Sequence, residues 1–295
     1  MASHEYAVEE TGGRSTLTTA GLKTAEDWRR LLSPYPYIVL AANSDAVDMK
    51  ALQAEFPPNS LFVFFNKVYK ILDRPFEGNA LLVARSGTMG ANIVYRREVG
   101  DVVAYFPNEG FLGIMNLRVD AGERLSDPSE FGGGVPVGYL DQADFFAEFY
   151  PPGRMPTSGF ALALWLSDLK IPGRIVLAGF TARRSAKWKV FDVHDWTFEQ
   201  TFLRLFARLG RISMHSGTEV NAYVRLAQRF SDIPPAEIAL TAAEVLAERL
   251  DNANAEIDRL ISATKMIRSV DSFFRRLKPK TRKQKFLEKQ QQKEG

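Results

Sequence analysis

A histidine stands directly before a predicted helix, at a position where the helix would control its protonation. The run HDWTFE at 194–199 opens a helix that is expected to continue to about Leu209, before Gly210. The positive end of a helix dipole disfavours an imidazolium ion, so His194 would stay neutral near physiological pH and could act as a general base. The alternative interpretation is a surface histidine next to an ordinary helix cap.

Small hydroxyl residues and a glycine precede a second predicted helix. Pro156 is followed by Thr157, Ser158 and Gly159, directly before an apolar run at 160–169. A helix start leaves backbone N–H groups free, and its dipole favours an anion such as a nucleotide phosphate. The alternative is a Ser or Thr cap without a ligand.

Two asparagines end two predicted strands. Asn43 follows the run YIVLAA, and Asn66 follows the run LFVFF. In open α/β sheets ligands bind beyond the carboxyl ends of the strands, where an amide offers a donor and an acceptor to a base, ribose or phosphate. The alternative is that asparagine suits the turns that follow strands.

Metal chemistry is disfavoured by what the sequence lacks. It has no cysteine, so disulfides, thiolate ligands and a cysteine nucleophile are excluded, and no two aspartates are separated by a single residue. Asp192, His194 and Asp195 are candidate ligands, without the paired histidines of the zinc motif H-E-x-x-H. We therefore expect no metal. A metal-dependent hydrolase using these three residues is an alternative, and it predicts loss of activity with a chelator.

The elements that must position these residues alternate between strand and helix. Unbroken apolar runs at 37–43 and 61–66, with helical spacing between them, indicate a βαβ unit whose parallel strands are covered on both faces. This alternation predicts an α/β fold with a doubly wound, mostly parallel Rossmann-like sheet. Further strands are expected at 80–84, 102–106 and 174–180, and helices at 24–32, 44–56 and 160–169, the last of them buried.

The chain is expected to divide into three parts. Residues 1–22 predict a flexible N-terminal arm, residues 23–220 form the domain with the candidate site, and residues 221–295 form a helical extension with a basic tail. From Ala243 to Ile267 the extension places apolar residues at alternating steps of three and four, which is typical of a coiled-coil seam. This seam either joins two copies in a homo-oligomer or docks onto the domain of its own chain.

Charge and hydropathy limit the partners and the location. The chain has 295 residues, is 45% hydrophobic and 25% charged, and has a formal net charge of +3. Its C-terminus interleaves basic residues with Phe and Leu, which either hold the protein on an anionic membrane surface or form a solvated tail. The domain shows no basic stripe with stacking aromatics, so no nucleic-acid partner is expected. No apolar run reaches the roughly 18 residues of a membrane span, and the polar N-terminus has no signal core. We expect a cytoplasmic protein, peripheral on the inner membrane face if the tail binds there.

Taken together in their order along the chain, the motifs resemble the sialyltransferase family of the animal type (glycosyltransferase family 29) and its bacterial Kdo-transferase-like relatives. The stretch from YIVLAANS to FFN is similar to the family's long nucleotide motif. PTSGFALALWLSDL followed by IVLAGF is similar to its short motif, and VHDWTFEQ to its very short motif. The resemblance spans roughly residues 37–212 and implies a GT-A-like variant of the Rossmann-like fold.

The resemblance implies a role for each matching residue. His194 would be the catalytic base, with Glu199 supporting it. The family's second histidine, which lies near the phosphate of the nucleotide-sugar donor, is missing. Arg183, Arg184, Lys187 or Lys189 would supply the positive charge instead. The disulfide of the animal members is impossible without cysteines. The donor would be bound by Asn43, Asn66, Thr157, Ser158, Gly159 and Gly179.

The implied function is a metal-independent inverting glycosyltransferase that moves Kdo or sialic acid from a CMP-sugar to a hydroxyl of a glycan or lipid-linked glycan. Kdo is favoured, because a cytoplasmic bacterial protein would meet Kdo polymers. Acceptor contacts are expected from loops at 85–100, 107–150 and 181–193. The alternative is a catalytically silent nucleotide-binding or assembly protein of a capsule or lipopolysaccharide pathway, in which the C-terminal helix carries the function. The stretch 43–46, which lacks the family's tight glycine, supports this alternative, whereas the retained His194 and Glu199 argue against it.

Overall fold

The computed structural model describes residues 17–85, 87, 92–182, 193–215, 226–227 and 229–277. The side chains of residues 263 and 265–277 lie outside this description. The chain divides into two units, Met1–Gly217 and Thr218–Gly295, and each is described by itself.

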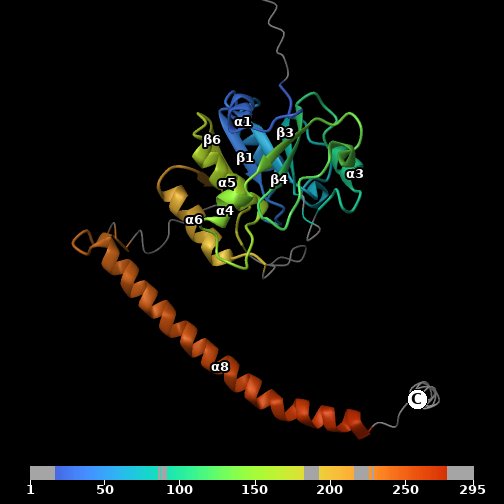
Figure 1. The fold of residues 1–295 in the computed structure, drawn as a ribbon. Helices are drawn as coiled ribbons and strands as arrows, with labels where there is room; N and C mark the ends of the chain where they lie inside the picture. The colour runs from blue at the N-terminus through green and yellow to red at the C-terminus, as the bar shows by residue number, and fades with distance from the viewer. Residues whose placement is uncertain are drawn as a thin grey trace, which may run out of the picture. The chain divides into compact units, whose positions relative to one another are not determined.

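The first unit is built on a seven-stranded sheet with the order β5-β4-β3-β2-β1-β6-β7. The strands are β1 Tyr37–Ala41, β2 Leu61–Phe65, β3 Asn79–Arg85, β4 Phe111–Arg118, β5 Val137–Asp141, β6 Arg174–Ala178 and β7 Ser213–His215. All the neighbouring strands pair in parallel. The chain runs outward from β1 to β5 and then returns to place β6 on the other side of β1 (Figure 1). The predicted doubly wound, Rossmann-like α/β sheet is therefore confirmed.

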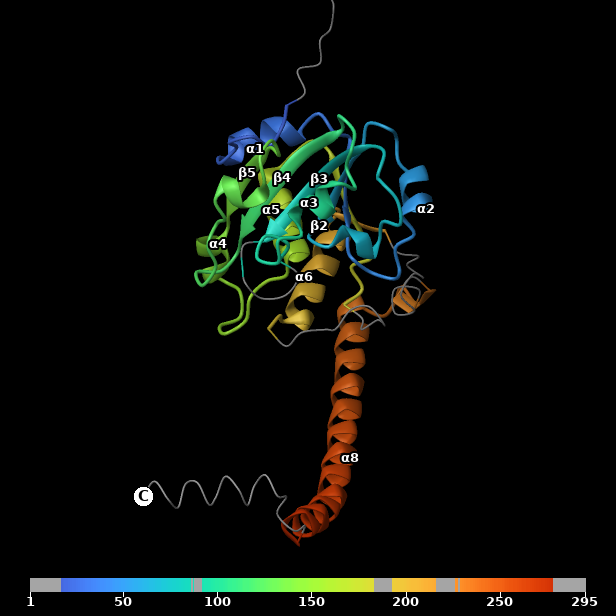
Figure 2. The ribbon, with the colours of Figure 1, turned by 90° about the vertical axis from the view of Figure 1, so that its right-hand side faces the viewer.

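Helices cover both faces of this sheet. They are α1 Ala25–Leu32, α2 Met49–Ala54, α3 Val99–Val103, α4 Ala143–Ala147, α5 Ser158–Leu169 and α6 Trp196–Arg208, with 3₁₀ turns at Val68–Lys70 and Pro128–Phe131. Ile38 and Leu40 of β1 join a core with α1, α4, α5 and α6, whereas Val39 and Ala41 join a core with α2 and α3. Figure 2 shows α2 on the opposite side of the unit from α1 and α4. Strands buried on both faces explain the unbroken apolar runs of the sequence.

Most of the expected elements are present, and one is wrong. The runs at 37–43, 61–66, 80–84 and 174–180 contain β1, β2, β3 and β6, and the expected helices correspond to α1, α2, α5 and α6. The run at 102–106 does not form the expected strand, because its first residues complete α3 and the ring of Phe106 packs on Phe64. A short apolar run has too little periodicity to separate a strand from a helical turn.

Two strands lie in a stretch where only loops that contact the glycan acceptor were expected. β4 and β5 fall within 107–150 and extend the sheet beyond β3. Inside β4, Gly113 has a φ of +114°, and Thr19 and Pro136 approach the space that a side chain would fill. Asn116, in the same strand, is fully buried. A glycine and an asparagine inside a strand interrupt the apolar pattern by which strands are predicted.

The end of the expected N-terminal arm is attached to the sheet. The N–H of Thr19 donates to the carbonyl of Leu112 and its hydroxyl donates to that of Pro136, so this threonine is fully buried. The N–H of Gly21 donates to the carbonyl of Val137. Residues 17–22 are therefore held by the domain rather than loose, while residues 1–16 lie outside the described residues.

The second unit contains one long helix, α8, at Pro235–Leu277 (Figure 1). It includes the stretch in which the sequence predicted a seam. Leu246, Leu250 and Leu260 of this helix are 60%, 61% and 66% exposed. None of the helices in the described residues is long and apolar enough to cross a membrane.

Candidate functional site

A polar cluster lies around the segment that leads into α5. This segment, residues 155–157, contacts three side chains: His194, Arg85 and Glu199. Arg85 ends β3, and the other two flank the start of α6. The strand order reverses between the neighbouring strands β1 and β6. Sheets of this kind bind ligands at such a reversal, beyond the carboxyl ends of the strands. The cluster therefore brings together two of the motifs that the sequence singled out.

His194 lies just before α6, as expected, and Asp195 caps that helix. Its Nδ1 is 2.7 Å from the carbonyl oxygen of Met155. Because a carbonyl oxygen can only accept, Nδ1 carries the proton of the neutral ring and Nε2 keeps its lone pair. Within the described residues, Nε2 has no hydrogen-bond partner. This is the tautomer that a general base acting through Nε2 requires.

The surroundings also favour the neutral form of His194. Burial lowers its pKa below the ordinary value of 6.5, and the positive charge of Arg85 lowers it further. The hydrogen bond to Met155 opposes these effects but is smaller than the effect of burial. At physiological pH the imidazole is therefore able to accept a proton.

Glu199 is buried in the first turn of α6, with 2% of its surface exposed. It accepts three hydrogen bonds: from the N–H of Thr157 at 2.7 Å, from the Thr157 hydroxyl at 2.7 Å, and from the Tyr150 hydroxyl at 2.9 Å. Burial raises the pKa of Glu199 to about 7, although these bonds and Arg85 act to lower it. No hydrogen bond joins Glu199 to His194 in the described part of the chain. Any support that it gives to the histidine therefore passes through other residues.

Tyr150 is one such intermediary. Its hydroxyl donates to Glu199 and accepts from the N–H of Asp195 at 3.1 Å, next to His194. Burial, followed by the negative charge of Glu199, raises the pKa of Tyr150, so its hydroxyl keeps its proton. Tyr150 was not predicted from the sequence, because 49 positions separate it from Glu199 and no local pattern marks it.

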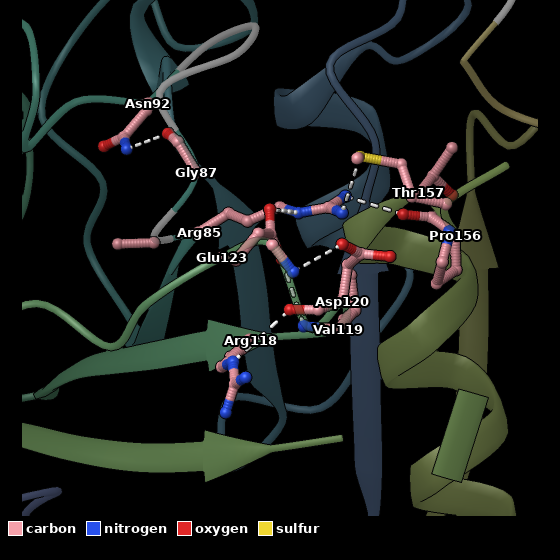
Figure 3. A network of polar contacts seen from close by, with 12 residues as sticks. Arg85, Gly87, Asn92, Arg118, Val119, Asp120, Glu123, Pro156 and Thr157 are labelled. Atoms are coloured by element: carbon pink, nitrogen blue, oxygen red, sulfur yellow. Dashed lines mark hydrogen bonds and ion pairs between the residues drawn. The ribbon is translucent and has the colours of Figure 1, made fainter. Parts of the chain in front are cut away.

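Arg85 holds the segment from the side of β3, as Figure 3 shows. Its Nη1 donates to the carbonyl of Pro156 at 2.6 Å, and its Nη2 lies 3.3 Å from the sulfur of Met155. Its Nε is paired at 2.5 Å with Glu123, and the two side chains are 12% and 6% exposed. Breaking such a buried pair leaves a charge without a partner. Neither member of this pair was predicted from the sequence.

The start of α5 has the threonine cap that was the alternative interpretation of this motif. Thr157 is the N-cap, and its hydroxyl accepts from the N–H of Phe160 at 3.2 Å while it donates to Glu199. Within the described residues, the backbone N–H groups of Ser158 and Gly159 have no hydrogen-bond partner. Two free donors at the positive end of a helix can bind an anion. This position is therefore the candidate site for a phosphate or carboxylate group.

The other residues expected at the donor have contacts within the protein. The Nδ2 of Asn43 donates at 2.7 Å to the carbonyl that ends β2, but its buried Oδ1 has no partner among the described residues. Asn66 has a φ of +43°, and its Oδ1 accepts from the N–H of Arg85 at 3.4 Å. Gly179 has a φ of +79°, and a Cβ there would overlap Val47. Local structure thus accounts for Asn66 and Gly179, while the buried Oδ1 of Asn43 accepts no hydrogen bond from the described residues.

Several expected residues lie outside the described residues. They are Arg183, Arg184, Lys187 and Lys189 of the expected phosphate contacts, Asp192 of the alternative metal site, and the tail after residue 277. Within the described ranges, no group of three or more His, Asp or Glu side chains is arranged to hold a metal ion. His215 is bonded to Glu55 at 2.7 Å and has no contact with the 155–157 segment.

No protein-family model and no curated protein matches this chain. Among solved structures, it is similar to the crystal structure of a mammalian sialyltransferase in complex with Gal-beta-1-3GalNAc-ortho-nitrophenol. The similarity has a TM-score of 0.37 and 14% sequence identity, and it covers 64% of this chain and 72% of that chain. The assignment of a function therefore rests on the site and on the sequence motifs.

Proposed function

We propose that this protein is a metal-independent, inverting glycosyltransferase that transfers Kdo or sialic acid from a CMP-sugar to a glycan hydroxyl. The observation that carries the proposal is the bond from Nδ1 of His194 to Met155, which leaves Nε2 unprotonated. The same short stretch of chain continues into the free N–H groups of Ser158 and Gly159. A base and an anion-binding position thus lie at one short segment, the first hydrogen-bonded to it and the second at its end, as a transfer reaction with an anionic leaving group requires.

In the proposed reaction, the acceptor hydroxyl attacks the anomeric carbon while the bond from that carbon to the CMP phosphate oxygen breaks. The hydroxyl proton passes to Nε2 of His194, a role that typically contributes about 10²–10⁴ in rate. The charge that develops on the leaving phosphate is stabilised by the N–H groups of Ser158 and Gly159. A single displacement of this kind inverts the configuration at the anomeric carbon.

The choice of CMP rests on the motifs that resemble the sialyltransferase family. The unpartnered Oδ1 of Asn43 supports a nucleotide at the strand ends, since it could accept from an amino group of the base or from a ribose hydroxyl. Kdo and sialic acid are both acidic sugars, so either would present a carboxylate beside the phosphate. Kdo is favoured only by the expectation of a cytoplasmic bacterial protein.

The donor class is tested by titrating the full-length protein with CMP in the presence of EDTA, with UDP and GDP as controls. Selective binding of CMP in the micromolar range is expected. Equal affinity for the three nucleotides would remove the donor assignment. A requirement for divalent metal would overturn the metal-independent mechanism.

The base is tested by His194→Ala, with His215→Ala as the matched control. His194→Ala should lower transfer by about 10²–10⁴ while the affinity for CMP stays within a few-fold. His215→Ala should preserve both properties, because this histidine contacts Glu55 and not the 155–157 segment. Parallel loss of CMP affinity and transfer in His194→Ala would contradict the role of a base.

A catalytically silent nucleotide-binding or assembly protein is the second candidate. The internal bonds of Asn66 and Thr157 favour it, because both side chains have partners without any ligand. This candidate predicts that CMP-Kdo and CMP-sialic acid bind but are neither transferred nor hydrolysed. Single-turnover assays with both donors therefore separate the two candidates.

A further inference from the structure

The helix α8 carries a continuous seam of mostly apolar residues at alternating steps of three and four. Two of its members, Leu250 and Leu260, are 61% and 66% exposed. This seven-residue spacing is the pattern of a coiled coil, in which each seam residue packs between side chains of a second helix. The seam comprises Ala239, Ala243, Leu246, Leu250, Ala253, Ile257, Leu260 and Thr264.

We propose that α8 pairs with α8 of a second copy of this chain in an antiparallel coiled coil. The proposal is independent of the catalytic function. Two features determine the direction of pairing: the distribution of charge along the helix, and the order of large and small residues in the seam.

Charge is distributed unequally along α8. Residues 235–256 include five acidic residues and one arginine, a net charge of −4. Residues 257–277 include two acidic and five basic residues, a net charge of +3. In a parallel pair the two acidic halves would lie side by side and repel each other. In an antiparallel pair the start of each helix, residues 235–246 with a net charge of −2, can lie along residues 257–268 of the other copy, whose net charge is +2.

The sizes of the seam residues select the same direction. In a parallel pair each seam residue faces its own counterpart, so Ala239, Ala243 and Ala253 would form three layers of alanine facing alanine, with unfilled space. In an antiparallel register centred between residues 251 and 252, Ala243 and Ala253 face leucine, so large and small residues interdigitate there, and Ala239 faces Thr264. The layers of this register are Leu250 with Ala253, Leu246 with Ile257, and Ala243 with Leu260 of the second copy.

Residues beside the seam fix the register. Arg249 would face Glu256 of the second copy, and the twofold axis makes this contact twice. Leu240 and Ile261, which are 56% and 47% exposed, would face each other across the edge of the seam. A shift of one copy by one heptad would instead bring Glu256 against Glu256 of the second copy, and like charges there would repel.

The direction is tested by disulfide trapping, which the absence of cysteine in the sequence makes simple. Leu246→Cys and Ile257→Cys full-length chains are mixed, equilibrated under reducing conditions and then oxidised. We expect a mixed disulfide dimer, because these two positions share a layer. Neither variant should crosslink with itself, because its two cysteines would be about 16 Å apart along the helix axis.

Ala255→Cys, on the outer face of the same stretch, is the matched control and should give no crosslinked dimer. Self-crosslinking of Leu246→Cys and of Ile257→Cys would establish a parallel pair and overturn the proposal. Absence of every crosslink would overturn it as well.

The register and the stoichiometry are tested by sedimentation equilibrium. The wild-type chain is expected at twice its mass of 33.1 kDa. Arg249→Glu and Glu256→Arg should each raise the dimer dissociation constant by about tenfold, and the double variant should restore it, because the swapped charges again face each other. No restoration would reject this register. A monomer mass at all concentrations would reject the dimer. The alternative, a seam that docks onto its own chain, predicts that mass.

Discussion

Replacing Glu199 by glutamine is expected to remove a pH dependence of stability that this one buried carboxyl creates. Burial raises the pKa of Glu199 from its ordinary value of 4.5 to about 7 in the folded protein. A carboxyl with a higher pKa in the folded than in the unfolded state takes up a proton on folding at intermediate pH. The free energy of unfolding therefore falls as the pH rises from about 4.5 through 7.

The size of this effect follows from the two pKa values. In the unfolded chain Glu199 is already losing its proton at pH 5, whereas in the folded protein it keeps its proton until near pH 7. The loss of stability between pH 5 and pH 8 that is attributable to Glu199 is then about 2.5 kcal/mol. Other groups also titrate in this range, so the quantity to measure is the difference between the wild type and the variant.

Glutamine suits this test because the site can accept it. Its Oε1 can accept from the Tyr150 hydroxyl and from the N–H of Thr157, as one oxygen of Glu199 does. Its Nε2 can donate to the hydroxyl oxygen of Thr157, which has a second lone pair beside the bond from Phe160. The substitution therefore removes the charge and keeps the contacts.

The assay is urea unfolding at several pH values between 5 and 8, followed by tryptophan fluorescence. All four tryptophans, Trp28, Trp165, Trp188 and Trp196, belong to the first unit, so the signal reports its unfolding. Glu130→Gln is the control, because Arg124 lowers the pKa of Glu130 to about 2, outside the measured range. A difference in unfolding free energy between wild type and Glu199→Gln that stays constant from pH 5 to pH 8 would refute the reasoning.

The remaining predictions concern the base, the buried ion pair and the tail. Because burial lowers the pKa of His194, the acidic limb of kcat/KM should have its midpoint below pH 6.5, and activity should be lost as the imidazole is protonated; a pH series from 4.5 to 8 with a higher midpoint would contradict this. Arg85→Met should lower the free energy of unfolding by roughly 3–5 kcal/mol, because Glu123 stays buried without a cation. Adding Glu123→Gln should recover most of that loss in the same urea assay, and no recovery would show that the pair is not its cause. A chain that ends at Ser269 should co-sediment more weakly with anionic vesicles, by about 1 kcal/mol for each basic residue that contacts the surface; undiminished binding would exclude the tail as an anchor.

Those strands whose residue composition depends on burial alone could be predicted from the sequence. β1, β2, β3 and β6 lie inside the sheet with helices on both faces, so each reads as an unbroken apolar run. β4 carries Asn116, whose amide donates to the carbonyl of Ala84 and whose oxygen accepts from the N–H of Ser126. A buried asparagine is acceptable there because its amide has hydrogen-bond partners, and nothing in the local sequence announces them.

The same limit applies to the site. His194, Thr157 and Glu199 could be found because helix starts have local signatures and because the motifs have fixed spacing. Arg85 and Tyr150 reach the cluster over long separations in sequence, 71 positions from Arg85 to Pro156 and 49 from Tyr150 to Glu199. Each of them matters because of the carbonyl or carboxylate that it contacts after folding. The local sequence around Arg85 or Tyr150 does not encode that contact.

His194 and Glu199 lie on opposite sides of the N-cap of α6, and this difference in position separates their roles. Asp195 caps α6, so His194 stands before the helix and Glu199 lies in its first turn. The histidine uses one ring nitrogen on Met155 and keeps the other, whereas the carboxyl of Glu199 is occupied by three bonds from Thr157 and Tyr150. In an enzyme, substitution of His194 should therefore change the rate, and substitution of Glu199 should change stability and its pH dependence. In a silent protein both substitutions would act on stability alone, so measuring both properties in both variants decides between the two functions.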